Sequence, residues 1–171
     1  MKYWFVVHDL MAYSQHNDMI GCRVKEKGLR TPKFAQFAEI QKGDKIVYYA
    51  TRDKVVVGIF DVVSDMEYLA NDPYWNEIIV FSIKPVDMPP EGYYLDFKKF
   101  IDDENVQLSL FPKKKIWARY LQGKTCRKLT QNDFEKMRSY LQKSNYLVET
   151  KMLKLKKTRW HMRERKIGKA K

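Results

Sequence analysis

Only five residues of this chain are of the types that most often bind transition metals or pair as nucleophile and base: His8, His16, His161, Cys22 and Cys126. Neither cysteine has a partner at a metal-ligand spacing such as C-x2-C. The chain also lacks a Walker glycine loop, a G-x-S-x-G motif and a dinucleotide-binding fingerprint. The sequence therefore predicts no metal ion and no cofactor, zinc and haem included.

Positive charge is concentrated at the C-terminus. Residues 151–171 contain ten Lys or Arg against one Glu, so they carry +9 of the formal net charge of +12. A basic segment exchanges counterions with a polyanion and speeds encounter, which makes nucleic acid the leading partner class. An anionic membrane surface and a purely solubilising tail are the alternatives. The predicted phosphate contacts of this tail are Lys156, Lys157, Arg159 and Arg163, with Trp160 among them as a base-stacking candidate.

Length and composition indicate one domain with an appendage. The 171 residues are 44% hydrophobic and 14% aromatic, which suffices for a substantial core. The apolar run at residues 3–7 is too short for a signal peptide, and no later run approaches membrane-spanning length. We therefore expect a cytoplasmic protein with reduced cysteines and no membrane partner.

Two β-forming runs give the strongest structural signal. They occupy residues 45–50 and 55–63 and are separated by the polar sequence TRDK. Dense β-branched and aromatic residues on both sides of a turn-like segment predict an antiparallel hairpin.

The other elements follow from apolar spacing and capping residues. Helices are expected to begin after the N-cap candidates Asp9, Thr31 and Thr130. The remaining predicted elements are strands at 2–7, 19–24 and 77–83, a short helix at 95–101, a final strand with a turn within 113–129, and a helix with the apolar stripe Phe134, Met137 and Leu141. Several short strands with a few helices predict an α+β domain built on a curled sheet.

Three segments together resemble the EVE domain, a member of the PUA-like superfamily. They are MKYWFVV at the start, KGDKIVYYA followed by VVVGIFDVVSD, and KKKIWARYLQGKTCRKLTQNDFEKM near the end. The resemblance covers about residues 1–145 and leaves residues 146–171 as a basic tail. Within this tail, Leu153, Trp160 and Ile167 are spaced by seven residues, which predicts one apolar helical stripe when the tail is bound to a partner. The resemblance implies a PUA-like pseudo-barrel, a curled mixed β-sheet with peripheral helices, related to YTH and ASCH domains. It also implies binding of a modified base in DNA or RNA.

The resemblance also implies a base pocket built from four segments. Asp9 follows the first strand, where it either accepts hydrogen bonds from a base or simply caps the next helix. The other pocket residues are Ile20, Gly21 and Cys22, then Tyr49, Ala50 and Thr51, and finally Tyr74 and Trp75 as a stacking surface or a barrel plug.

The aromatic side chains available to this pocket are fewer than a full aromatic cage would need. Ile20 stands where relatives usually carry tryptophan, and an aliphatic side chain lacks the π face that holds a methylated base. Strand alternation allows only one of Tyr48 and Tyr49 to face the pocket. Trp4 and Trp117 match family positions and are assigned mainly to the core.

The late motif adds Arg119, Lys124 and Arg127 as phosphate-binding candidates, with a solvated face as the competing account. The sequence thus predicts a module that binds RNA or DNA and recognises a modified base, rather than an enzyme. Two alternatives are kept. One is an ASCH-like hydrolase acting on RNA or nucleosides through Asp9 with His8 or a lysine, and the other is a structural protein of a ribosome or other complex.

Overall fold

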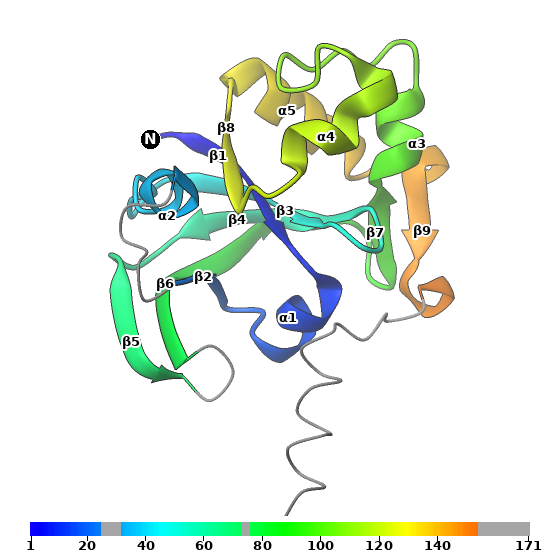
Figure 1. Cartoon of the computed structure of the whole chain (residues 1–171). Helices are drawn as coiled ribbons and strands as arrows, with labels where there is room; N and C mark the ends of the chain where they lie inside the picture. Colours follow the sequence, from blue (N-terminus) through cyan, green and yellow to red (C-terminus); the bar gives the residue numbers. More distant parts are fainter. Residues whose placement is uncertain (25–31, 73–75, 154–171) are drawn as a thin grey trace, which may run out of the picture.

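The computed structural model describes residues 1–24, 32–72 and 76–153 (Figure 1). The α-helices of these residues are α1 (Leu10–Gln15), α2 (Pro32–Phe37), α3 (Phe97–Asp102), α4 (Trp117–Leu121) and α5 (Gln131–Tyr140). The strands are β1 (Tyr3–His8), β2 (Met19–Arg23), β3 (Lys45–Ala50), β4 (Val55–Val62), β5 (Glu67–Asp72), β6 (Asn76–Asp87), β7 (Tyr93–Asp96), β8 (Cys126–Leu129) and β9 (Leu147–Glu149). None of the helices in these ranges is long and apolar enough to cross a membrane.

A parallel pair and a hairpin form the centre of the sheet. β1 runs parallel to β3, with Phe5 opposite Val47 and His8 opposite Ala50. β3 then pairs antiparallel with β4 across the turn at residues 51–54, so the predicted hairpin is confirmed. Trp4, Phe5 and Val6 are all completely buried, which explains why β1 carries consecutive apolar residues instead of alternating ones.

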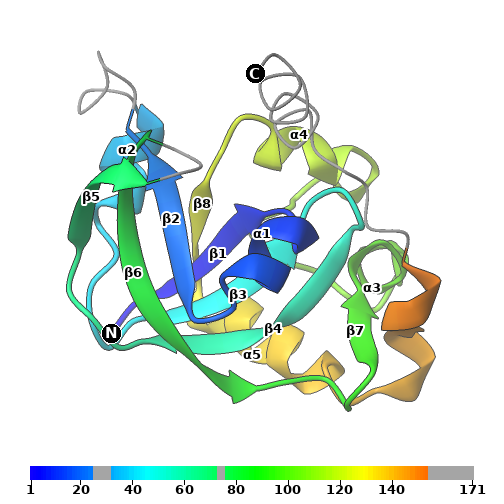
Figure 2. The ribbon, with the colours of Figure 1, turned by 90° about the horizontal axis from the view of Figure 1, so that it is seen from below.

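The sheet curls because the long strand β6 pairs with different strands along its two halves. Its first half pairs with β2 and β5, and its second half pairs with β4. The resulting order is β2-β6-β4-β3-β1-β8, with β5 on β6, β7 on β4 and β9 on β7. Figure 2 shows the sheet wrapping around its own interior. The predicted fold class is confirmed: this is an α+β, PUA-like curled mixed sheet with peripheral helices.

Two cores lie on the opposite faces of the central strands. The inner core, inside the curl, contains Trp4, Tyr48, Phe60 and Phe81. The outer core packs the other face of the same strands against α3, α4 and α5, which Figure 1 shows gathered on one side of the sheet. Its large side chains include Phe5, Tyr49, Phe97, Phe111 and Phe134. Alternation along β1 and β3 therefore sends neighbouring side chains into different cores.

Capping residues set the starts of the helices on either side of the sheet. The Asp9 carboxylate Oδ1 accepts a hydrogen bond from the Ala12 amide at 2.7 Å, and the Thr130 hydroxyl accepts one from the Asp133 amide at 3.1 Å. The predicted N-caps at Asp9 and Thr130 are confirmed, and the third, Thr31, lies outside the described residues. The Asp133 carboxylate does not return to Thr130 as in a full capping box; it accepts instead from the Ser109 amide and hydroxyl and the Leu110 amide.

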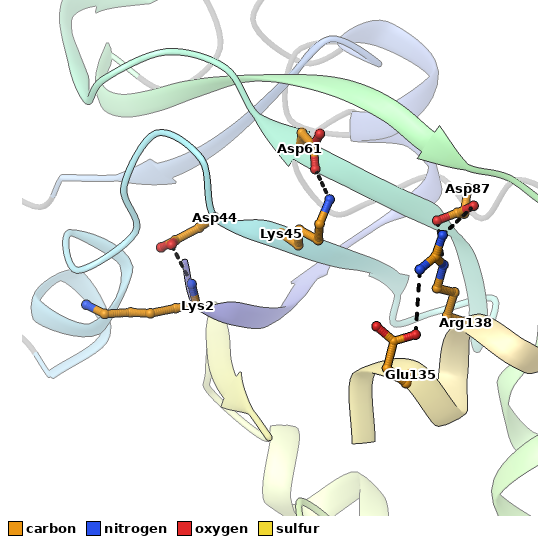
Figure 3. Close-up of polar contacts among 7 residues, drawn as sticks. All are labelled: Lys2, Asp44, Lys45, Asp61, Asp87, Glu135 and Arg138. Atoms are coloured by element: carbon orange, nitrogen blue, oxygen red, sulfur yellow. Dashed lines mark hydrogen bonds and ion pairs between the residues drawn. The ribbon is translucent and has the colours of Figure 1, made fainter. Parts of the chain in front are cut away.

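Asp44 explains the Gly43-Asp44 turn that precedes β3. Its carboxylate is only 2% exposed and accepts three hydrogen bonds, from the Lys2 amide at 2.7 Å, the Trp4 indole N–H at 2.8 Å and the Gln41 amide at 3.1 Å. Figure 3 shows Asp44 beside Lys2, and the more exposed Lys45–Asp61 ion pair on the neighbouring strands. One buried side chain thus joins the start of β1 to the start of β3.

The described chain has more structure near its end than the sequence indicated. Within 113–129 the predicted strand is present as β8, but a 3-10 turn at Lys114–Ile116 and helix α4 precede it. β5, β7 and β9 were not predicted. β9 lies beyond residue 145, the expected end of the domain, and pairs with β7 through Tyr94 opposite Val148. The segment predicted as a basic tail therefore begins within the sheet.

Candidate functional site

The ends of β1 and β3 form one edge of the molecule. Because the two strands are parallel, both reach this edge at their C-termini, and the Thr51 amide donates to the His8 carbonyl at 2.8 Å. Asp9 and Thr51 are the first residues beyond the strands. Two residues expected in the base pocket, far apart in sequence, are thus brought together by backbone pairing.

A cavity of about 670 Å³ lies at this edge, between the β3–β4 turn and α4. That volume is within the usual range for a site that takes a small ligand. Five of the predicted site residues line it, together with His8, Arg52, Lys54 and Trp117 among others. The five are Asp9, Tyr49 and Thr51 from the predicted base pocket, and Arg119 and Lys124 from the predicted phosphate contacts.

The aromatic part of the cavity comes from Tyr49 and Trp117. Their ring centroids are 6.0 Å apart and the rings are nearly perpendicular, at 85°. Tyr49 is 1% exposed, packs on Phe5 at 5.2 Å, and has its pKa raised by burial despite a side-chain hydrogen bond with Thr51. Trp117 is only partly buried and packs against the outer core. Of the two rings, only that of Trp117 has exposed surface for a ligand, and the buried Tyr49 ring supports it from the core.

Tyr48 points to the opposite face, which answers the alternative left open by the sequence. It lies in the inner core with ring centroids 5.6 Å from His8 and 5.2 Å from Tyr13. Burial, with the nearby Asp9 carboxylate and the Tyr13 and Tyr94 hydroxyls, raises the pKa of Tyr48. Tyr49 is the member of the pair that lines the cavity.

Asp9 is the helix cap that the sequence allowed, and it also has the position expected of a pocket residue. Its Oδ1 caps α1 through the Ala12 amide, and the residue also lines the cavity. Oδ2 takes no part in the cap. A carboxylate fixed in this way presents a hydrogen-bond acceptor, so it favours an amino or N–H edge over a carbonyl.

Other predicted pocket residues lie elsewhere. Ile20, Cys22 and Ala50 are buried in the inner core. A side chain at Gly21 would lie 2.5 Å from the Ile78 side chain, so this glycine serves packing between β2 and β6. Tyr74 and Trp75 lie outside the described residues, as do the tail candidates Lys156, Lys157, Arg159 and Arg163. Arg127 is on β8 and is not among the residues that line the cavity.

Among the cavity residues that sequence reasoning missed, three have side chains suited to binding a nucleotide: Trp117, Arg52 and Lys54. Trp117 was assigned to the core, and nothing in the sequence shows that α4 turns its ring toward the end of β3. Arg52 and Lys54 belong to the TRDK turn, whose position at the strand edge was predicted. Their charge next to the strand ends was the available signal. With Arg119 and Lys124 they give the cavity four cationic side chains against the single carboxylate of Asp9.

Both cysteines are buried, and neither forms a disulfide within the described residues. Burial raises the pKa of the Cys126 thiol to about 12, so almost none of it is thiolate at neutral pH. No group of three His, Cys, Asp or Glu side chains arranged to hold a metal ion occurs in the described ranges.

His8 makes the stability of this edge dependent on pH. Its Nε2 is inaccessible to solvent and has no hydrogen-bond partner among the described residues. Burial lowers its pKa from 6.5 to about 4, although Asp9 acts in the opposite sense. Between these values the unfolded chain binds the proton and the folded chain does not, so stability falls as pH is lowered. We expect a loss of about 2 to 3 kcal/mol from His8 between pH 7 and pH 4.

Urea denaturation at a series of pH values measures this loss. The His8→Phe variant should show a shallower decline between pH 6.5 and pH 4, and His16→Phe serves as the control histidine. If His8→Phe declines as steeply as the unchanged chain over that interval, His8 is not the responsible group.

The curled sheet with three helices packed on its outer face places this chain in the PUA-like fold. Comparison with known proteins bears out the resemblance to EVE domains at the level of fold. No protein-family model matches the chain, and no curated protein matches it in sequence.

Among solved structures, the crystal structure of human THYN1 in complex with DNA containing 5-methylcytosine is similar, with a TM-score of 0.52 and 14% identity over 84% of this chain and 99% of that chain. A Leishmania major protein has a TM-score of 0.55 and 14% identity over 82% and 94% of the two chains. A Rhodopseudomonas palustris protein has a TM-score of 0.54 and 12% identity over 82% and 92%. At such identities the likeness establishes the fold.

Proposed function

We propose that this chain binds nucleic acid and holds a single modified base in the cavity at the ends of β1 and β3. The observation that carries this proposal is the composition of that cavity: an aromatic wall, one carboxylate and four cations within about 670 Å³. Bases have π faces and polar edges, and their backbone carries phosphates, so each part of the cavity has a counterpart in a nucleotide. The similar fold of THYN1, solved with DNA containing 5-methylcytosine, supports nucleic acid as the partner class.

In this proposal the aromatic rings contribute stacking and Asp9 contributes selectivity. A base resting on Trp117 buries apolar surface without any sequence requirement. Asp9 then accepts from an N–H or exocyclic amine, which favours bases that present such a donor. Tyr74 and Trp75 stay a prediction for a further stacking surface.

Phosphate contacts add affinity that does not depend on sequence. Arg119 and Lys124 line the cavity, and the basic tail beyond Leu153 carries nine more Lys or Arg. Each phosphate that such residues neutralise on a single strand adds about 0.7 to the dependence of log K on log salt concentration. The cavity therefore selects the base, and the tail strengthens binding to a strand of any sequence.

Fluorescence anisotropy with single-stranded DNA and RNA 12-mers tests both halves. Each probe carries either unmodified bases or one methylated base, and each titration is repeated at several salt concentrations. We expect one modified probe to bind at least several-fold more tightly than its unmodified partner. Truncation after Leu153 should reduce the salt slope and leave this preference intact, with circular dichroism verifying the fold. Equal affinity for every probe would remove base recognition, and a preference lost with the tail would contradict the division of labour.

A further inference from the structure

We propose that the cavity is a two-sided phosphate clamp, in which the β3–β4 turn binds the phosphate on one side of the held nucleotide and the α4 end binds the phosphate on the other. This inference rests on the proposed function and specifies its ligand: an internal nucleotide of a single strand, rather than a terminal nucleotide or a free nucleoside. Figure 2 shows α4 and the β3–β4 turn flanking the end of β1, where the cavity lies.

The α4 side consists of Arg119 and Lys124. Arg119 is exposed on the short helix, and Lys124 is half-buried just after Gly123, whose φ of 68° reverses the chain. The Lys124 amide donates to the Leu121 carbonyl at 3.0 Å, which fixes the backbone from which its side chain extends. Neither cation forms an ion pair with a described carboxylate. Both are therefore available for a phosphate at this side.

The turn side is centred on Lys54. Its φ of 57° is in the left-handed region, which makes it the only described residue other than glycine with a positive φ. That conformation costs a lysine roughly 1 kcal/mol or more and is normally given to Gly, Asn or Asp. The Lys54 carbonyl accepts from the Phe97 amide at 2.9 Å, so the turn is tied to α3. A charged side chain kept in a strained turn beside a cavity points to a role for that charge.

The aromatic wall lies between these two sides. Tyr49 precedes the turn by a few residues, and Trp117 begins α4, so each side of the clamp is joined to one of the two rings. A base stacked on the wall would have its sugar near the rim of the cavity. Within a strand that sugar is linked to a phosphate in each direction, which matches cations on both sides. A terminal nucleotide or a nucleoside would leave one or both sides without a partner.

The test uses the full chain and the single-stranded 12-mers described above. Lys54→Asn removes one side and keeps the turn, because asparagine tolerates a positive φ. Arg119→Gln with Lys124→Gln removes the other side. Lys98→Gln with Lys99→Gln is the control matched in charge to this second variant, since both lysines are on α3 and neither lines the cavity.

Each clamp variant should reduce the slope of log K against log salt concentration by about 0.7, and the combined variant by about 1.4. The α3 control should leave the slope unchanged, and every variant should keep its base preference. If only one side changes the slope, or if Lys54→Asn binds like the unchanged chain, the clamp is wrong while the proposed base recognition stands. If the unchanged chain binds no 12-mer, both fail together.

Discussion

Replacing Asp44 with alanine is expected to lower the free energy of unfolding by about 3 kcal/mol, which corresponds to a fall in Tm of roughly 6 to 12 °C. The carboxylate is almost fully buried and accepts from the Lys2 amide, the Trp4 indole and the Gln41 amide. Alanine would leave three donors without this acceptor, the Trp4 indole N–H in a buried position and the two amides in partly buried ones, and an unpaired donor away from water is costly. Urea denaturation followed by tryptophan fluorescence measures the change.

Asp61→Ala is the matched control for this experiment. It removes an aspartate from the adjacent strand and breaks its 2.6 Å contact with Lys45, but the Asp61 side chain is 40% exposed (Figure 3). A surface ion pair of this kind contributes less than about 1 kcal/mol. A loss for Asp44→Ala no larger than that for Asp61→Ala would show that the buried hydrogen bonds do not anchor β1 to β3.

The elements that the sequence predicted are those whose signals are local. The β3–β4 hairpin has two dense β-forming runs and a polar turn in succession, and the caps at Asp9 and Thr130 bond to amides three residues away. Such features need no knowledge of distant contacts. The run Trp4, Phe5 and Val6 likewise indicates a strand buried on both faces by itself.

The elements that were missed depend on partners far away in the sequence. β9 has three residues and pairs with β7, more than fifty residues earlier. β5 exposes Tyr68 and Leu69, so its apolar side chains give no sign of a buried face. In both cases a neighbouring strand, and not intrinsic propensity, makes the segment extended.

In the candidate site, too, some features follow from local sequence and others from contacts with distant parts of the chain. Alternation required Tyr48 and Tyr49 to face opposite ways, but the choice between them follows from where α3 and α4 pack. Phe97 and Trp117 meet the Tyr49 ring at 4.9 and 6.0 Å and so place that face in the outer core. The positions of Ile20 and Cys22 were also decided by packing, because β2 closes the inner core. Residue type indicated the chemistry of the site, and tertiary contacts decided which residues of that type reach it.

Trp117→Leu is expected to weaken binding of the preferred single-stranded 12-mer by about tenfold to a hundredfold, the range that loss of one base–aromatic stack produces. Leucine keeps much of the apolar contact with Phe97 and Phe111, whose rings lie 5.2 and 6.4 Å from Trp117, but it has no π face. The salt slope should stay unchanged, because no phosphate contact is removed. Anisotropy titrations at several salt concentrations separate the two effects.

Trp117→Phe distinguishes stacking from simple packing. Phenylalanine retains a π face at the same position on α4, so most of the affinity should return, whereas leucine and phenylalanine would behave alike if Trp117 only filled space in the outer core. Urea denaturation of both variants checks that they are folded at the titration temperature. Affinity that is insensitive to either change would place the base elsewhere, and Tyr49, fixed by Phe5 and Phe97, would then have no role beyond the core.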